Sequence, residues 1–287
     1  MKRSYKIHQI DAFTKVPFKG NPAAVTFSMD LSEEEMKMIA NEMNLSETAF
    51  IGTSENADYR LRWFTPSTEV NLCGHATIAS LHYLSELGKI NNRPFITFET
   101  NSGVLKCPVN KDEYLMQIPK MELNEYSGPE DKILDALGLG KDYKKEYPLI
   151  MLQNGYLFIY VKKLETLKSL KPDFGRLLEL SIEHNIQSFD VFTLETFDKE
   201  SFAHSRFFTP YDGINEDPVT GSANGPLMLV LLKLGLLEQN ENVITKIFEQ
   251  GDIMGRPGRV KVTYTADKDE LYIGGNAVTV LRGELVI

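Results

Sequence analysis

The chain has 287 residues, of which 42% are hydrophobic and 10% aromatic, and this composition is typical of a globular protein with a sizeable core. Its 31 Lys and Arg against 40 Asp and Glu give a net charge of −9, and no basic run is long enough to follow a phosphate backbone, so nucleic acid is not an expected partner. No apolar run approaches the length of about 18 residues that crosses a bilayer, and no apolar signal core follows the first basic residues. We therefore expect a cytoplasmic protein without a membrane span.

The two cysteines, Cys73 and Cys107, are expected to be free thiols in a chain without an export signal. Cys107 lies in the apolar strand pattern GVLKCPV and is predicted to be a core residue. No CxxC or HExxH spacing is present, so no metal site is expected.

In chain order, the first half reads mostly as short strands rich in β-branched and aromatic residues. Between them, residues 31–44 (LSEEEMKMIANEMN) predict an amphipathic surface helix with a capping box formed by Ser32 and Glu35. The expected strands are 5–14, 23–28, 48–53, 59–65, 94–100, 103–109 and 113–119.

The second half begins with a polar segment, 121–146, which contains Gly-Pro and one short helical pattern, EDKILDALG. A domain junction is expected near the start of this segment. The strands expected after it are 147–153, 156–162, 188–194, 205–210, 244–250, 259–265, 270–275 and 278–287.

An internal duplication is readable by eye. RWFTP at 62–66 recurs as RFFTP at 206–210, and each copy continues through a polar loop, a small-residue turn, an apolar run and a Leu-Gly end. With a three-residue insertion in the second loop, 73–76 (CGHA) falls opposite 220–223 (TGSA). The weaker match of LSETAFI at 45–51 with QSFDVFTL at 187–194 extends the repeat upstream, so two similar domains are implied.

The apolar runs 76–87 and 226–237 predict helices that are apolar on most faces and must therefore be buried on all sides. Gly88 and Gly235 stand where C-terminal caps are expected. The fold predicted is α+β, with two pseudo-symmetric domains that each curl a mixed sheet around one central buried helix.

A helix N-terminus binds carboxylate or phosphate through its free N–H groups, so Gly74 and Gly221 predict one anion site if the two helix starts face each other across a cleft. The alternative, that these small residues only let a buried helix pass between strands, remains open. His75 lies in the first helical turn, where the dipole favours a neutral imidazole, and a functional role is favoured over a structural one. Cys73 is expected at the cap; a buried thiol is favoured over a catalytic thiolate, since its duplicate is Thr220.

Two acidic residues have ordinary structural explanations. Asp217, in NEDPVTGSAN, precedes the second helix start and can cap the turn through Asx hydrogen bonds. Glu47 begins an apolar strand directly after a helix, and its simplest interpretation is a solvated loop residue.

Four motifs together resemble the PhzF-like phenazine biosynthesis proteins, which share the diaminopimelate epimerase-like fold. They are DAFTKVPFKGNPAAV (11–25), LSETAFI (45–51), RWFTP with NLCGHAT (62–77) and EDPVTGSANGPL (216–227). The resemblance implies two domains with an active site in the cleft between them, no cofactor, and commonly a homodimer.

The resemblance also assigns roles. Glu47 matches the glutamate of the SETxF motif, which takes a proton from carbon and returns it elsewhere, so it must be shielded enough to do both. His75 and Asp217 match positions that orient the substrate and assist proton movement. Gly74, Gly221 and Ser222, with Cys73 beside them, match positions that hold the substrate carboxylate or charge developing next to it.

The chain departs from relatives of the same fold that use two cysteines, because Thr220 replaces the second one, and this argues against two-base stereoinversion. Many relatives also carry His where this chain has Asn224.

We therefore predict domains at 1–124 and 125–277, with the final strand 278–287 packing back on the first. The predicted function is a cofactor-independent isomerase of a small carboxylate-bearing metabolite. The alternatives are an epimerase or racemase with Cys73 as one base, and a non-catalytic metabolite-binding scaffold.

Overall fold

The computed structural model describes residues 3–90, 93–110, 113–119, 121–140 and 145–287. The chain forms two compact units, one made of residues 1–118 with 272–287 and the other of residues 119–271. Within the described ranges, no helix is both long and apolar enough to span a bilayer.

The first unit is a mixed sheet. β2 pairs antiparallel with β1 and parallel with β3, β3 and β4 are antiparallel, β4 is parallel to β6, and β6, β7 and β8 form an antiparallel meander. The strands are β1 (Ser4–Ala12), β2 (Asn21–Phe27), β3 (Glu47–Gly52), β4 (Tyr59–Phe64), β5 (Glu69–Val70), β6 (Phe95–Thr100), β7 (Gly103–Asn110), β8 (Glu113–Ile118) and β18 (Ala277–Val286).

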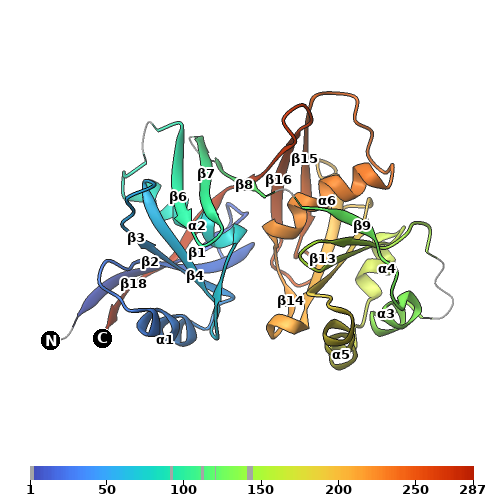
Figure 1. The fold of residues 1–287 in the computed structure, drawn as a ribbon, viewed down its shortest axis with the longest axis horizontal. Coiled ribbons are helices and arrows are strands. Elements are labelled where there is room, and N and C mark those ends of the chain that lie inside the picture. Colours follow the sequence, from blue (N-terminus) through green and yellow to red (C-terminus); the bar gives the residue numbers. More distant parts are fainter. Residues whose placement is uncertain (1–2, 91–92, 111–112, 120, 141–144) are drawn as a thin grey trace. The chain divides into compact units, whose positions relative to one another are not determined.

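The central helix of this unit is α2 (Gly74–Glu86), which contacts β1, β2, β3, β8 and β18 (Figure 1). Its residues 74–81 are all buried, which confirms the prediction of a helix covered on every side. The helix ends at Gly88, whose φ of 69° lets the N–H of Lys89 donate to the carbonyl of Leu84 in a Schellman motif. α1 (Glu33–Met43) packs against β3 and β4, with the predicted Ser32–Glu35 capping box.

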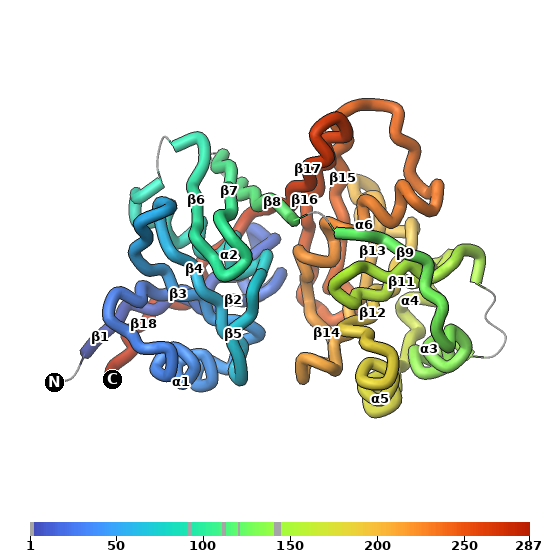
Figure 2. Tube along the Cα trace, viewed as in Figure 1, coloured from blue at the N-terminus to red at the C-terminus, as the bar shows by residue number. Residues whose placement is uncertain are grey.

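The chain ends beside its own beginning in the first unit. β18 lies antiparallel to β1, and Arg3 and Ile287 exchange two backbone hydrogen bonds of 2.7 and 2.9 Å (Figure 2). In the second unit, β10 corresponds to β1. β9 pairs antiparallel with β10 and so takes the place that β18 has in the first unit. β9 lies in the polar segment in which the sequence predicted no strand.

The second unit repeats the connectivity of the first. β11 is parallel to β12, β12 antiparallel to β13, β13 parallel to β15, and β15 antiparallel to β16. α6 (Gly221–Lys233) takes the place of α2, is similarly buried, and is followed by Gly235 with a φ of 68°. The strands are β9 (Leu123–Glu125), β10 (Ile150–Leu152), β11 (Tyr156–Tyr160), β12 (Ser188–Thr193), β13 (Ala203–Thr209), β14 (Ile214–Asp217), β15 (Val243–Gln250), β16 (Gly258–Thr265) and β17 (Glu270–Gly275), which runs on into the first unit.

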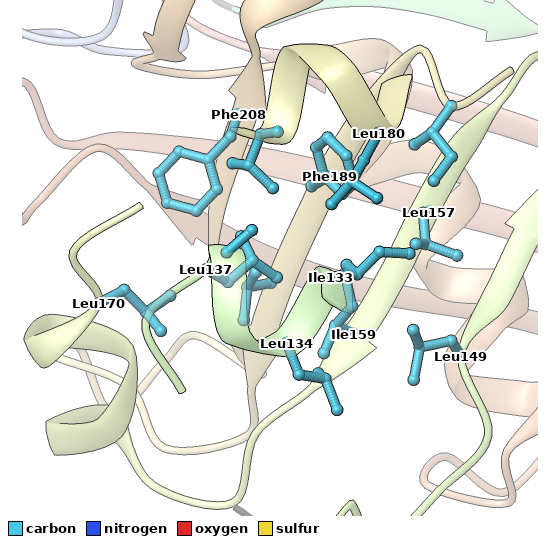
Figure 3. Packing of buried hydrophobic residues seen from close by; sticks show 14 of the residues in the cluster. Ile133, Leu134, Leu137, Leu149, Leu157, Ile159, Leu170, Leu180, Phe189 and Phe208 are labelled. Carbon is cyan, nitrogen blue, oxygen red and sulfur yellow. The ribbon is translucent and has the colours of Figure 1, made fainter. Parts of the chain in front are cut away.

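A second core in this unit fills the space between strands β11 to β13 and the helices α3 (Glu130–Ala136), α4 (Leu164–Ser169) and α5 (Phe174–His184) (Figure 3). Leu157, Phe189 and Phe208 contribute from the strands, and Ile133 and Leu180 from the helices. Sequence reasoning missed α4 and α5. The signal for α5 was present, because Asp173 caps its first turn by accepting from the N–H of Arg176, and Leu177 and Leu180 lie on one face.

Candidate active site

Glu47 is the first residue of β3 and lies directly after α1. α1 ends at Asn44, which adopts the left-handed conformation with a φ of 49°, and the chain then turns into the strand. The register of β2 and β3 places Glu47 opposite Ala23. Its side chain is only 16% exposed, so the solvated loop residue allowed by the sequence is not what the fold produces.

Asn21, at the start of β2, is fully buried and reaches the same place. The preceding Gly20 has a φ of 61°, and a β-carbon there would lie 2.1 Å from the carbonyl oxygen of Ala12. Only glycine therefore allows the loop to enter β2 along this path.

His75, in the first turn of α2, connects these residues. Its Nε2 lies 3.2 Å from Oε2 of Glu47, and its Nδ1 lies 3.3 Å from Nδ2 of Asn21 and 3.5 Å from Sγ of Cys73. Neither Nε2 nor the facing Glu47 oxygen has another hydrogen-bond partner among the described residues, and their own contact is poorly aligned for one. The structure thus brings Glu47, His75 and Cys73 together, and adds Asn21, which sequence reasoning missed.

The charges in this cluster are coupled. Burial, reinforced by Glu47, raises the pKa of the Cys73 thiol, so Cys73 is expected to be neutral. Burial lowers the pKa of His75, but Cys73 and Glu47 raise it, and the net pKa lies well above its ordinary value. With Cys73 neutral, the carboxylate of Glu47 is the charge that favours the imidazolium. The nearby carboxylate thus opposes the helix dipole, on which the prediction of a neutral imidazole rests.

The start of α6 in the second unit is held by a different network. Asp217, at the end of β14, accepts a hydrogen bond from the hydroxyl of Thr220. Gln250, at the end of β15, accepts from the backbone N–H of Thr220 at 2.9 Å and from Nδ2 of Asn224 at 2.7 Å, and donates to the carbonyl of Asp217 at 2.8 Å. This buried network fixes the turn before the helix, which agrees with the turn-capping role considered for Asp217.

The two helix starts share one feature. Neither Cys73 nor Thr220 places its side chain on the first N–H groups of the following helix, although each occupies the N-cap. Gly74 and Gly221 are the first helical residues in both cases and are buried. Such uncapped helix starts are available to an anion. Ser222 is half-buried, and its hydroxyl lies 3.4 Å from the hydroxyl of Tyr156.

Sequence reasoning missed Asn21, Gln250 and Tyr156 at these sites. Asn21 lies within the quoted GNP motif, so its position was visible although its contact with His75 was not. Gln250 is 30 residues beyond Thr220 and ends an ordinary strand pattern, IFEQ, so no local signal distinguishes it.

Two clusters in the described ranges offer metal-ligand atoms close together. In the first cluster, Glu47 lies near Nε2 of His75, whereas Cys73 lies near Nδ1. An ion bound to one ring nitrogen would therefore lie beside only one of these two partners in this arrangement. In the second, His204 bonds Glu249 at 3.0 Å, and Arg259 neutralises Glu249 and Asp252 at 3.2 and 3.0 Å. The second cluster is an internal ion network.

A mixed sheet around a buried helix, present twice, with a largely buried carboxylate and an imidazole at one helix start, is an α+β architecture of the epimerase-like fold. Residues 10–283 match the sequence profile of the family described as phenazine biosynthesis-like protein, PhzC-PhzF. The chain belongs to this family.

Individual relatives agree. An uncharacterized isomerase of Clostridium acetobutylicum is 38% identical, with all of both chains covered. The crystal structure of a PhzF-family phenazine biosynthesis protein from Bacillus anthracis is 31% identical, with a TM-score of 0.92 over 99% of this chain and 100% of that one. A hydroxyproline epimerase from Agrobacterium vitis, at 12% identity and a TM-score of 0.63 over 99% of this chain and 93% of that one, shares the fold. The predicted family, fold class and isomerase class are confirmed.

Proposed function

We propose that the protein is a cofactor-independent isomerase in which Glu47 takes a proton from a carbon atom of a small carboxylate-bearing metabolite and returns it at another position. The observation that carries the proposal is the 3.2 Å approach of His75 Nε2 to Glu47 Oε2 in a buried setting. A carboxylate that moves a proton needs a partner that responds to its change of charge, and an imidazole can do so by hydrogen bonding or by charge.

The substrate class follows from the helix starts. Uncapped N–H groups at Gly74 and Gly221 favour a carboxylate, and a carbon acid next to a carboxylate develops negative charge as its proton leaves. The proposal assigns Asp217 and Ser222 to substrate orientation in the same reaction.

A cysteine-based epimerase is less well supported. The pKa of the buried Cys73 thiol is raised, and a neutral thiol is a poor base. Thr220 occupies the duplicate cap, so a second thiol is not supplied there.

The test is solvent exchange. Carboxylic-acid metabolites incubated with the enzyme in deuterated water are examined by NMR and mass spectrometry for deuterium at carbon. We expect exchange with the wild type and none with Glu47→Gln, while Cys73→Ala retains exchange. Exchange that survives Glu47→Gln but is lost in Cys73→Ala would select the epimerase instead, and saturable binding of a metabolite without exchange would select a binding scaffold.

A further inference from the structure

We propose a second ligand site in the second unit, a groove that takes a small cationic ligand with a flat apolar body. The groove has a volume of about 620 Å³, within the range of small-molecule sites. It is bounded by β9 and the residues after it, by the turn between β10 and β11, and by the C-terminal end of α5. The groove shares no residue with the Glu47 cluster or with the start of α6.

The first evidence is a set of polar groups that the protein leaves unused. The Tyr126 hydroxyl and the Ser181 hydroxyl belong to groove residues, and neither has a hydrogen-bond partner within the described ranges. Nε2 of His184, also a groove residue, lies 3.6 Å from a carboxylate oxygen of Glu183. Ser181 is only 1% exposed. Buried polar groups are rarely left unpaired, so two of them in residues of one groove indicate a missing partner.

The lack of a hydrogen-bond partner for Ser181 is unusual for a buried serine inside a helix. A buried serine or threonine inside a helix usually bonds the carbonyl four residues earlier. Thr77 and Ser80 do so in α2, at 2.6 and 2.7 Å. Ser181, inside α5 and lining the groove, does not, and its buried hydroxyl has no partner among the described residues.

The charge around the groove selects the ligand. Its described lining residues include Glu125 and contain no Lys or Arg. Burial raises the pKa of Tyr126, and the carboxylates of Glu130 and Glu183 add to the rise. Glu130 is paired with Lys145, so Glu125 and Glu183 are the carboxylates that favour a cation here. The carbonyl end of α5 contributes in the same direction. A cation is therefore favoured, in contrast to the anion expected at the helix starts.

The apolar part of the ligand has matching surfaces. Met151, Ile182 and Tyr211 line the groove, and Ile182 and Tyr211 are 65% and 52% exposed. An aromatic ring carrying an ammonium group satisfies both the apolar surfaces and the field.

The experiment titrates the full-length protein with three probes of similar shape: phenethylammonium, 2-phenylethanol and phenylacetate. We expect saturable binding of phenethylammonium in the millimolar range by NMR, as is usual for a fragment of this size, and weaker binding in the order alcohol, then anion. Ser181→Ala and Tyr126→Phe should each weaken it about fivefold, and Glu125→Gln about threefold. Tyr5→Phe and Glu165→Gln, which alter a hydroxyl and a carboxylate elsewhere, should leave it unchanged.

The site does not depend on the proposed isomerase reaction, and Glu47→Gln should bind phenethylammonium as the wild type does. Equal or tighter binding of phenylacetate would overturn the charge assignment. Absence of saturable binding up to about 20 mM, or binding that both groove variants leave unaltered in a folded protein, would overturn the site.

Discussion

The two units share a scaffold but not a chemistry, and the strand register makes the comparison residue by residue. Phe64 and Phe208 hold the same place in RWFTP and RFFTP. Thr48 pairs with Phe64, and Phe189 pairs with Phe208. Counting one residue back along each strand, Glu47 of β3 corresponds to Ser188 of β12.

The corresponding positions carry different groups. Where the first unit has a carboxylate near His75, the second has Ser188, whose hydroxyl donates to Thr209 at 2.9 Å. His75 itself corresponds to Ser222. The duplication kept two helix starts that suit an anion, while the acid and the imidazole belong to one copy only. In the proposed reaction, the duplicated helix starts hold the substrate carboxylate, and the side chains without a counterpart move the proton.

The strongest test of this comparison is to remove the carboxylate of Glu47, which has no counterpart in the second unit. Glu47→Gln preserves shape but cannot accept a proton, and we expect carbon-bound deuterium exchange to fall by at least about 1000-fold. Ser188→Ala, the matched change in the other unit, should cost about 1 kcal/mol of unfolding free energy and leave exchange within a few-fold of the wild type. Circular dichroism and urea unfolding of both variants provide the control. Equal losses of exchange in the two variants would mean that Glu47 and Ser188 contribute equally to the reaction.

A second set of corresponding positions has a structural role in both units. β4 pairs with β6 at Arg60 and Glu99, and β13 pairs with β15 at His204 and Glu249. Each pair forms an ion contact, but Glu99 remains partly exposed whereas Glu249 is fully buried. The same topological position thus holds a surface pair in one unit and a core pair in the other.

Glu249→Ala is accordingly expected to destabilise the protein by about 3 kcal/mol or more, because it leaves buried charges and backbone N–H groups unpaired. Glu249 accepts from the N–H groups of Phe197 and Asp198 as well as from His204. Glu99→Ala should cost far less, since water can replace its partners. Urea unfolding of both variants measures the difference, and equal costs would show that burial does not separate the two pairs.

The third prediction concerns Asn21, whose amide meets Nδ1 of His75 at 3.3 Å. An amide can present its nitrogen to a neutral ring or its oxygen to an imidazolium. Asn21→Ala should lower turnover about tenfold, and Asn21→Asp should raise the pKa of His75 further and move the pH profile of exchange upward. Asn41→Asp, on the surface of α1, is the matched control. Identical pH profiles for Asn21→Asp and the wild type would show that Asn21 does not position His75.

The sequence was most informative where local rules and the repeat acted together. Both buried helices, their starts at Gly74 and Gly221, and their glycine ends follow from an apolar pattern with small residues at fixed places. α4 and β9 were missed because each is short; α4 is stabilised through Leu167 in the second core, and β9 by its pairing with β10. α5 was missed although its cap and apolar face are visible in the sequence. Local propensity is weak where tertiary contacts decide.

The candidate site divides in the same way. Glu47 has no local signal of function; its role came from family resemblance, and its contact with His75 from the way β3 passes the start of α2. Asn21 and Gln250 reach their partners across 54 and 30 residues of chain, and such contacts depend on sheet register. The helix dipole at His75 is visible in the sequence, whereas the carboxylate that opposes it is brought there by the fold.

The smallest expected effect tests this last point. Because the pKa of His75 is raised above its unfolded value of about 6.5, the folded state holds a proton that the unfolded state releases. The resulting stability is complete below about pH 6 and is lost as the pH rises through the folded pKa. Urea unfolding at a series of pH values should show this decline in the wild type and a smaller one in Glu47→Gln, where the charge that favours the imidazolium is gone. Ser222→Ala, the matched change at the other helix start, should keep the wild-type decline, because serine does not titrate in this range. A decline of the same size in Glu47→Gln would show that the carboxylate does not hold the proton on His75.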